Sequence, residues 1–330
     1  MTHCLVTGGA GFIGSHLTEA LLACGHRVSV VDDESTGSVE NLAAVAKHPA
    51  FRYIKGTVAD RPLVRQLVAE VDEVYHLAAA VGVQLIAQSP IRTLETNVYP
   101  TELVLEELGR VHAAGRAVKF FLTSSSEVYG KNPKPQWTED DDLLIGPTVC
   151  PRWSYGASKA IDEFLALAYW RERGLPVIVG RLFNVVGPRQ TGAYGMVLPR
   201  LVDAALSGGP LVVHDDGRQV RCFAHVADVV RAILALMDHP EAVGSVLNIG
   251  SDQPISILEL ARQVIAAVDP SLRIEFQSYA DAYSRDFEDC RRRVPDLSRL
   301  RSLIDFRPRY DLDAAVREVV EWKKRMKDEG

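Results

Sequence analysis

The sequence predicts an α/β fold, in which a doubly wound parallel sheet is joined to a smaller α/β lobe. Short apolar runs alternate with helical patterns through the first half of the chain. A glycine-rich turn separates the first apolar run from the first helical pattern. The second half has shorter strands in more polar surroundings. Strands that alternate with helices favour βαβ units and a mostly parallel sheet covered on both faces.

The strands expected in the first half are short and mostly rich in apolar, β-branched or aromatic residues. They span residues 4–7, 27–31, 51–55, 73–77, 119–123 and 177–181. Helical periodicity separates these runs. The helices expected from it span residues 13–24, 62–69, 93–114 and 155–173.

The second half predicts further helices and strands and one long loop. The expected helices are 199–206, 227–237, 257–268 and 312–327, and the expected strands are 211–214 and 246–249. The polar stretch 281–296 reads as a long loop, and the acidic run 139–142 as a solvated one. We expect a nucleotide-binding domain over 1–182, with return segments at about 223–250. A second lobe is expected from 183–222 and 251–330.

Composition excludes several classes of protein. The formal charge of −6 over 330 residues gives no hint of binding to nucleic acid or an anionic membrane. No apolar run approaches the roughly 20 residues that span a bilayer. Residues 1–3 lead straight into the first strand with no cationic stretch, so no secretion signal is expected. The five cysteines are far apart, which favours small buried side chains in a reducing cytoplasm and no metal site.

The strongest local motif is the run Thr7-Gly8-Gly9-Ala10-Gly11-Phe12-Ile13-Gly14, which follows a strand and opens a helix. Glycines there allow a tight turn, close approach of a pyrophosphate and packing of the helix on the strand. Asp32 and Asp33 end the second strand, about 20 residues further on. A carboxylate there accepts hydrogen bonds from ribose hydroxyls and repels a 2′-phosphate. The motif therefore predicts a Rossmann domain that binds NAD rather than NADP.

A second group of residues predicts redox chemistry on a hydroxyl. Tyr155 and Lys159 are four residues apart, so they share one face of a helix. A nearby ammonium stabilises a phenolate, which suits Tyr155 as a general base while a hydride leaves to NAD. Ser125, Ser126 and Glu127 follow the fifth strand, at the edge where parallel sheets bind ligands.

Together these motifs resemble the extended short-chain dehydrogenase/reductase family, whose members modify nucleotide sugars. The segments that carry the resemblance are GGAGFIG, the Asp32 position, SSSEVYG, YGASK, RLFNVVGPR, RCFAHVAD and LNIG, and it runs from residue 1 to about 325. It implies that Ser125 bonds the sugar O4, that Tyr155 is the base and that Lys159 holds the nicotinamide ribose. One departure is Thr57 after Gly56, where the family usually has an Asp beside adenine.

The resemblance also implies two sets of binding residues. Those expected to bind the cofactor are Gly8, Gly11, Phe12, Ile13, Gly14, Asp32, Asp33, Thr57, Val58, Leu77, Ala78, Ala79, Asn97, Tyr155 and Lys159. Those expected to bind the substrate are Val81, Asn184, Arg189, Val197 and Arg221. Arg221 suits a nucleotide diphosphate, because a guanidinium pairs with two phosphate oxygens at once.

The family includes 4-epimerases, 4,6-dehydratases and uronate decarboxylases, which all begin by oxidising C4 of the sugar. Simple 4-epimerases usually have Ser or Thr at the position of Glu127, whereas decarboxylases of UDP-glucuronate have the Ser-Glu pair seen at 126–127. Those decarboxylases also carry an Arg in an RKPD-like segment, which residues 292–296 resemble and which maps to Arg293. The resemblance is therefore nearest to enzymes that convert UDP-glucuronate to UDP-xylose, with Arg293 and Glu127 among the catalytic residues.

Other interpretations stay open. The loop 78–85 lacks the proline and tyrosine typical of decarboxylases and is closer to that of an epimerase. Residues 187–190 occur in uronate epimerases and decarboxylases alike, and Arg189 could hold a carboxylate in either. A 4-epimerase of UDP-glucuronate or UDP-glucose is thus the alternative, followed by a 4,6-dehydratase, and an NAD-binding regulator is the non-enzymatic one.

The assembly is a further expectation from the resemblance. Relatives commonly form homodimers through a four-helix contact made by the helix near 93–114 and the helix that carries Tyr155. Leu103, Leu105, Phe164 and Leu167 suit that contact and equally suit an ordinary core.

Overall fold

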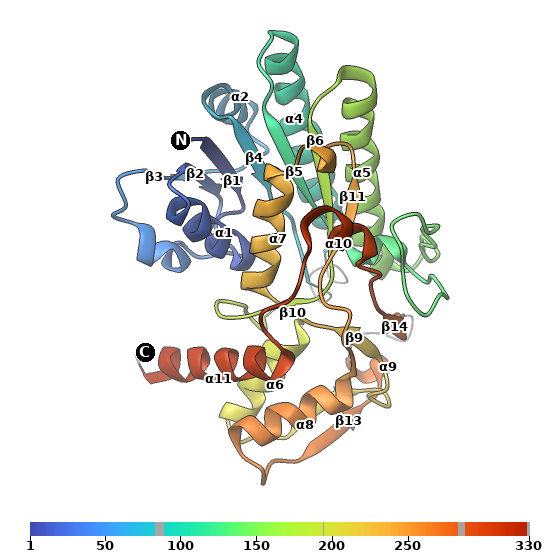
Figure 1. Cartoon of the computed structure of the whole chain (residues 1–330). Coiled ribbons are helices and arrows are strands. Elements are labelled where there is room, and N and C mark those ends of the chain that lie inside the picture. Colours follow the sequence, from blue (N-terminus) through green and yellow to red (C-terminus); the bar gives the residue numbers. More distant parts are fainter. Residues whose placement is uncertain (83–88, 194, 283–287, 329–330) are drawn as a thin grey trace.

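The computed structural model describes residues 1–82, 89–193, 195–282 and 288–328. Its centre is a seven-stranded sheet in the order β11-β6-β5-β4-β1-β2-β3, with every neighbouring pair parallel (Figure 1). The strands are β1 (His3–Thr7), β2 (Arg27–Asp32), β3 (Phe51–Lys55), β4 (Glu73–His76), β5 (Lys119–Ser125), β6 (Val177–Leu182) and β11 (Val246–Ile249). This confirms the expected doubly wound α/β fold.

The strand order places a crevice at one edge of the sheet. The chain starts at β1, moves outward to β3 and then returns to β4 on the other side of β1. The connections leave β1 and β4 in opposite directions, so a crevice opens at their carboxyl ends. Every residue of β1 and β6 is buried, as expected for strands covered on both faces.

Two hydrophobic clusters lie on the two faces of the sheet. One joins the sheet to α1, α7 and α10, and the other joins it to α2, α4 and α5 (Figure 1). These helices are α1 (Phe12–Ala23), α2 (Arg61–Glu70), α4 (Pro90–Ala113), α5 (Ser154–Arg173), α7 (Val226–Asp238) and α10 (Ser298–Ile304). Leu103 and Leu105 are buried in the second cluster, and Leu167 is partly buried against it, so these three belong to the core.

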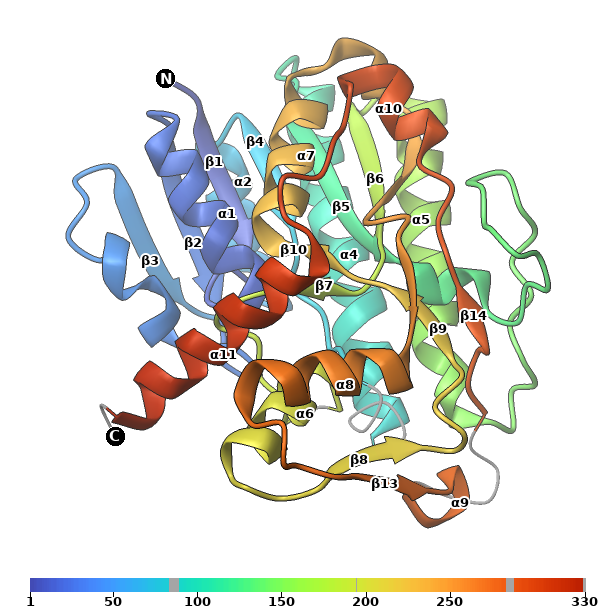
Figure 2. The same cartoon turned by 60° about the horizontal axis from the view of Figure 1, so that its bottom comes forward.

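The smaller lobe has its own hydrophobic core and lies beneath the carboxyl edge of the sheet (Figure 2). Its helices are α6 (Val197–Leu206), α8 (Ile257–Val268) and α11 (Leu312–Asp328), with a short α9 (Tyr279–Ala282). Its strands form two small sheets. One pairs β8 (Leu211–His214) with β13 (Ile274–Gln277), and the other has the order β12 (Pro254–Ser256), β9 (Val220–Cys222), β14 (Arg292–Arg293). Next to it, β7 (Val185–Val186) pairs with β10 (Ala224–His225). Short 3₁₀-helices, labelled η, cover Val39–Val45, Ser126–Tyr129, Pro151–Trp153 and Pro240–Ala242.

Two expectations about loops were wrong. The stretch 281–296 contains β14, because Arg292 and Arg293 pair with β9. The acidic run is only partly solvated, since Glu139 and Asp141 are buried. Glu139 accepts the backbone N–H of Asn248, and backbone pairing of this kind compensates a carboxylate for its lost water.

Four of the five free cysteines are buried, whereas Cys24 is exposed at the end of α1, against the expectation that each fills a buried position. Within the described ranges, no helix is both long and apolar enough to cross a membrane.

Candidate active site

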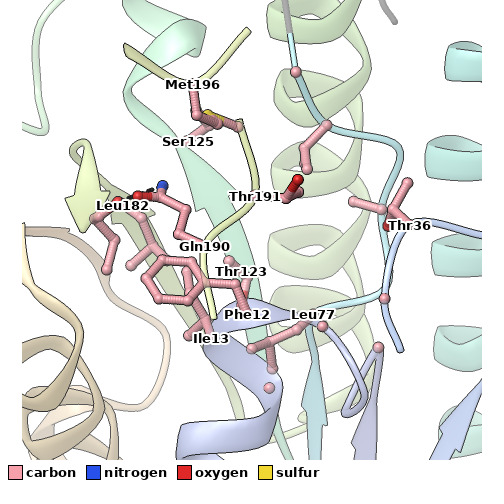
Figure 3. A pocket seen from close by; sticks show the side chains of 18 of the residues that line it. Phe12, Ile13, Thr36, Leu77, Thr123, Ser125, Leu182, Gln190, Thr191 and Met196 are labelled. Carbon is pink, nitrogen blue, oxygen red and sulfur yellow. Dashed lines mark hydrogen bonds between the residues drawn. The ribbon is translucent and has the colours of Figure 1, made fainter. Parts of the chain in front are cut away.

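A cavity of about 1190 Å³ runs along the carboxyl edge of the sheet, between the sheet and the smaller lobe. Its lining includes the turn before α1, the ends of β2, β4 and β5, the start of α5 and residues of the lobe. In Figure 3, Phe12 and Ile13 of α1, Leu77 after β4 and Thr123 of β5 surround this space together with Thr191 and Met196, which follow β7. The cavity thus lies at the crevice that the strand order creates.

The glycine-rich turn leaves backbone open to the cavity. Gly8 has φ +69, and a Cβ on Gly14 would lie 2.2 Å from the carbonyl oxygen of Gly8. Only glycine therefore lets the first turn of α1 pack so closely against the end of β1. Gly11 is the N-cap of α1 and offers no side-chain cap, so the N-terminus of the helix faces the cavity uncapped. Free N–H groups and the helix dipole at such an end favour a phosphate.

Asp32 and Asp33 both line the cavity at the end of β2. The Asp32 carboxylate accepts the backbone N–H of Ala10 at 2.9 Å and that of Glu34 at 2.8 Å. Burial raises the pKa of Asp32, and these two hydrogen bonds oppose the shift. The side chain of Asp33 is more exposed and accepts the N–H of Ser35. Asp32 is thus fixed beside the glycine turn, where its carboxylate could accept hydrogen bonds from the hydroxyls of a ribose.

Most of the other residues expected at the cofactor also line the cavity, namely Gly8, Gly11, Phe12, Ile13, Gly14, Thr57, Val58, Leu77, Ala78, Ala79, Tyr155 and Lys159. Asn97 does not line it. Its side chain accepts the N–H of Ala80 at 2.7 Å and donates to Ser158 at 3.1 Å, so it braces the loop after β4 from behind. That loop continues into residues 83–88, so the end of its expected epimerase-like part, 83–85, lies outside the described residues.

The start of α5 places Tyr155 against the end of β5. A Cβ on Gly156 would lie 2.5 Å from the carbonyl oxygen of Glu127, so glycine allows helix and loop to touch. Tyr155 is buried and lines the cavity with Ser125. Burial raises the pKa of the Tyr155 phenol, the Glu127 charge raises it further, and a hydrogen bond with Ser125 opposes both. The sequence-predicted hydroxyl and phenol are therefore brought together.

Lys159 also lines the cavity, one turn along α5 from Tyr155. Its ammonium contacts the carboxylate of Asp162 at 3.2 Å, and both side chains are buried. Asp162 was not expected at the site, because a carboxylate three residues further along a helix is typical of an ordinary surface charge.

Glu127 lies between two buried arginines. Arg152 contacts it at 2.6 Å and Arg293 at 2.7 Å. Burial alone would raise the pKa of the Glu127 carboxyl, but the two guanidiniums outweigh burial and hold that pKa well below its usual range. Ser126, the residue before Glu127, is buried and lines the same cavity. Arg293 is thus a buried residue of the site, and Arg152 is a site residue that the sequence analysis missed.

The residues expected to bind substrate line the lobe side of the cavity, namely Val81, Asn184, Arg189, Val197 and Arg221. The Arg221 guanidinium contacts the carboxylate of Asp289 at 2.8 Å. Asn184 donates its side-chain amide to the carbonyl of Cys222.

Arg189 points toward α1, where its guanidinium contacts Glu19 at 2.6 Å. This contact places it beside the helix that follows the glycine turn. The cavity also has walls that the motifs did not indicate: the segment 35–41 after β2, and Trp322 and Met326 on α11. Such residues carry no local signal, because only folding brings them to the cavity.

Comparison with known proteins agrees with this arrangement. Residues 4–250 match the model of the NAD dependent epimerase/dehydratase family. A UDP-N-acetyl-alpha-D-glucosaminuronate decarboxylase of Bacillus cytotoxicus is 37% identical over 327 residues, which cover 99% of both chains. UDP-glucuronic acid decarboxylase 1 of Arabidopsis thaliana is 35% identical, over 99% of this chain and 71% of its own length.

A solved structure extends the similarity to the fold. The UDP-glucuronic acid 4-epimerase of Bacillus cereus, in complex with UDP-glucuronic acid and NAD, superimposes with a TM-score of 0.85 at 27% identity. The match covers 98% of this chain and 99% of that one. The sequence, the fold and the geometry of the site thus agree, and this chain belongs to the NAD dependent epimerase/dehydratase family.

Proposed function

We propose that this protein is an NAD-dependent decarboxylase of a UDP-hexuronate, which converts UDP-glucuronate to UDP-xylose through a transient 4-keto sugar. The observation that carries the proposal is the buried group formed by Glu127, Arg152 and Arg293 beside Tyr155. Arg221 and Asp289 extend this group, and its three guanidiniums and two carboxylates leave a net positive charge. That charge suits a sugar with a carboxylate at C5 better than a neutral hexose.

The residues around the glycine turn fit an NAD cofactor. The uncapped start of α1 suits its pyrophosphate, Asp32 suits the hydroxyls of the adenosine ribose, and Lys159 suits the nicotinamide ribose. When bound, NAD supplies a positively charged ring that accepts a hydride from C4 and later returns it, and this charge favours the phenolate form of a nearby phenol.

Tyr155 then acts as the general base at the sugar. It takes the proton from the C4 hydroxyl, while Ser125 donates a hydrogen bond to the same oxygen. Glu127 and burial hold the proton on Tyr155 in the protein without cofactor. The phenol therefore becomes a base only in the assembled complex. After decarboxylation Tyr155 returns its proton to O4.

Oxidation at C4 makes the uronic acid a β-keto acid. The bond from C5 to the carboxylate breaks, CO₂ leaves, and the electron pair forms an enolate whose charge rests on O4. Ser125 and Tyr155 stabilise this charge by hydrogen bonds. C5 then takes a proton from water or from an acidic group on the Arg293 side of the cavity. Arg293 lines the cavity next to Glu127. The carboxylate of Glu127 holds both guanidiniums in place throughout.

Two observations favour other substrates or outcomes. The similarity to the Bacillus cytotoxicus enzyme favours an N-acetylated uronate, with an acetamido group at C2, as a second candidate substrate. The similarity in fold to the Bacillus cereus enzyme favours 4-epimerisation of UDP-glucuronate. Both alternatives keep the same oxidation at C4. They differ from the main proposal in the substituent at C2 or in the fate of the 4-keto sugar.

One experiment separates these outcomes. The protein is incubated with NAD and, in separate reactions, with UDP-glucuronate, UDP-N-acetylglucosaminuronate and UDP-glucose, and the products are analysed by mass spectrometry and NMR. We expect UDP-glucuronate to lose the mass of CO₂. An unchanged mass with a new sugar signal indicates an epimerase, and loss of water indicates a dehydratase. No change with any of the three contradicts a catalytic role.

The homodimer is also a proposal. Exposed apolar side chains gather on α4 and α5, and they are Ile91, Leu94, Tyr99, Ile161 and Phe164. Phe164 is 69% exposed, which is unfavourable in water and suits burial against a second copy of the same helix pair. Of the four residues expected at this contact, Phe164 is the one exposed there.

A further inference from the structure

A buried ion pair lies behind the proposed catalytic dyad. The Lys159 ammonium and the Asp162 carboxylate are 3.2 Å apart on α5, and their side chains are 3% and 0% exposed. Lys159 lines the cavity, whereas Asp162 does not. The carboxylate therefore holds the ammonium from its inner side. Such a pair is costly to bury, and removal of one partner leaves an uncompensated charge.

Groups from several elements surround this pair. The Thr101 hydroxyl of α4 lies near the Asp162 carboxylate but donates to the carbonyl of Asn97 at 2.8 Å, and Glu163 on α5 adds a second negative charge nearby. Thr101 also hydrogen-bonds His76 of β4 at 3.2 Å. Burial lowers the pKa of His76 to about 3, and the Lys159 charge lowers it too, so this ring is neutral at physiological pH. Among the described residues, Asp162 is the carboxylate that pairs with the Lys159 ammonium.

Charged groups also face Tyr155 from three directions. Glu127 follows β5, Arg293 comes from β14, and Asp162 lies two turns along α5, where its charge raises the pKa of the phenol. Arg152, from the η-helix before α5, contacts Glu127.

We propose that Asp162 is a positioning residue that anchors Lys159 for the cofactor and cancels its charge beside Tyr155. The inference rests on the proposed function, because it assigns Lys159 and Tyr155 the roles given above. A free ammonium would leave one positive charge on this face of α5, whereas the ion pair leaves none. Asp162 therefore adds to the effect of burial and of Glu127 in holding the proton on the phenol, and it keeps the ammonium directed at the cavity.

Two substitutions separate the charge from the anchor. Asp162→Asn keeps an oxygen that can accept a hydrogen bond from Lys159 but removes the negative charge. Asp162→Ala removes both. With either variant we expect the acid limb of the pH profile of kcat/KM to move to lower pH by about one unit, as expected when one nearby charge is lost.

The affinity for NAD gives a readout that does not depend on turnover. Lys159 is held by a charge-assisted hydrogen bond, so Asp162→Ala should bind NAD about tenfold more weakly, whereas Asp162→Asn should stay close to the unaltered protein. Binding is measured by calorimetry on the full chain. The control is Glu172→Gln, at an exposed acid of the same helix.

The outcomes are distinct. An acid limb that does not move in Asp162→Asn contradicts the charge role, and equal NAD affinity in Asp162→Ala contradicts the anchor. A merely structural residue would lower the melting temperature without either effect, and Asp162→Glu should restore the profile by restoring the charge. If the unaltered protein converts no UDP-sugar, the proposed function fails, and the NAD affinities still test the anchor.

Discussion

The Glu127 carboxylate and the Arg293 guanidinium touch at 2.7 Å, although they belong to different parts of the fold. Glu127 follows β5 at the edge of the large sheet, while Arg293 lies on β14 in the small sheet of the lobe. Both side chains are largely buried and lie in the same cavity as Tyr155. The contact therefore joins sheet and lobe at the point where the chemistry is proposed.

Replacement of Glu127 should change both stability and its dependence on pH. Glu127→Gln removes the carboxylate that contacts both buried guanidiniums and leaves them only Asp289, 3.9 Å from Arg152, so we expect a loss of about 3–5 kcal/mol in the free energy of unfolding at neutral pH. The pKa of Glu127 is depressed in the folded protein, so its contribution is present above the ordinary pKa of about 4.3 and is lost as the pH falls below it.

Urea unfolding of both proteins between neutral and acidic pH measures this effect. The difference between unaltered protein and Glu127→Gln should shrink as the solution becomes more acidic. A difference that stays constant with pH would show that the carboxylate is not ionised in the folded state.

Substitutions of the neighbouring residues Arg293 and Arg292 test whether the buried arginine is needed for activity, with the exposed one as its control. Arg293 is buried against Glu127, whereas its neighbour Arg292 is exposed and bonds the carbonyl of Pro135. Arg293→Gln should lower kcat for UDP-glucuronate by about 10²-fold or more, because a charge at the reacting centre is lost. Arg292→Gln should remain within a few-fold of the unaltered protein. Similar losses in both variants would assign Arg293 a structural role only.

Tyr155→Phe should nearly abolish turnover, by about 10³-fold, while NAD still binds. The phenyl ring fills the same buried space, so the fold is expected to persist. Tyr310→Phe, at an exposed tyrosine, is the control. Steady-state assays and NAD calorimetry on both variants test this prediction, which fails if Tyr155→Phe keeps activity within a few-fold.

Gly14→Ala should weaken the cofactor site through the backbone. Its new methyl group would lie 2.2 Å from the carbonyl oxygen of Gly8, so the turn and α1 must separate. We expect a loss of about 1–3 kcal/mol in stability, together with weaker NAD binding. Gly209→Ala meets no atom closer than 3.8 Å and is the control. Thermal unfolding with and without NAD distinguishes the two; equal stability would show that the turn relaxes freely.

Phe164→Asp should convert the proposed homodimer into a monomer. The charge would have to be buried at the contact between α5 and a second copy, which is unfavourable. Phe276→Asp is the control, since Phe276 is 58% exposed on β13 of the lobe. Sedimentation of the unaltered protein and both variants measures their mass. A dimer that survives Phe164→Asp would place the contact elsewhere.

The order of strands and helices was largely predictable, because the periodicity of apolar residues and the positions of turn-forming residues are local properties of the chain. The strand at 51–55 and the helix from Tyr155 follow directly from their apolar spacing. The pairing of the lobe's strands could not be predicted in this way. The strand β14 has two residues, and its pairing with β9 depends on a contact between segments far apart in the chain. The burial of Glu139 in the run 139–142 likewise could not be seen locally, since Glu139 accepts the backbone N–H of the distant Asn248.

By itself, the sequence determined the dinucleotide turn, the carboxylate at Asp32 and the dyad of Tyr155 and Lys159, because each is set by spacing along one strand or helix. Only the tertiary structure decided which charges meet. It enclosed Glu127 between Arg152 and Arg293, and it buried Asp162 behind Lys159. The physical reason is that Coulomb interactions act through space and strengthen when water is excluded. Neither the distance between two charges nor their burial can be deduced from the order of residues along the chain.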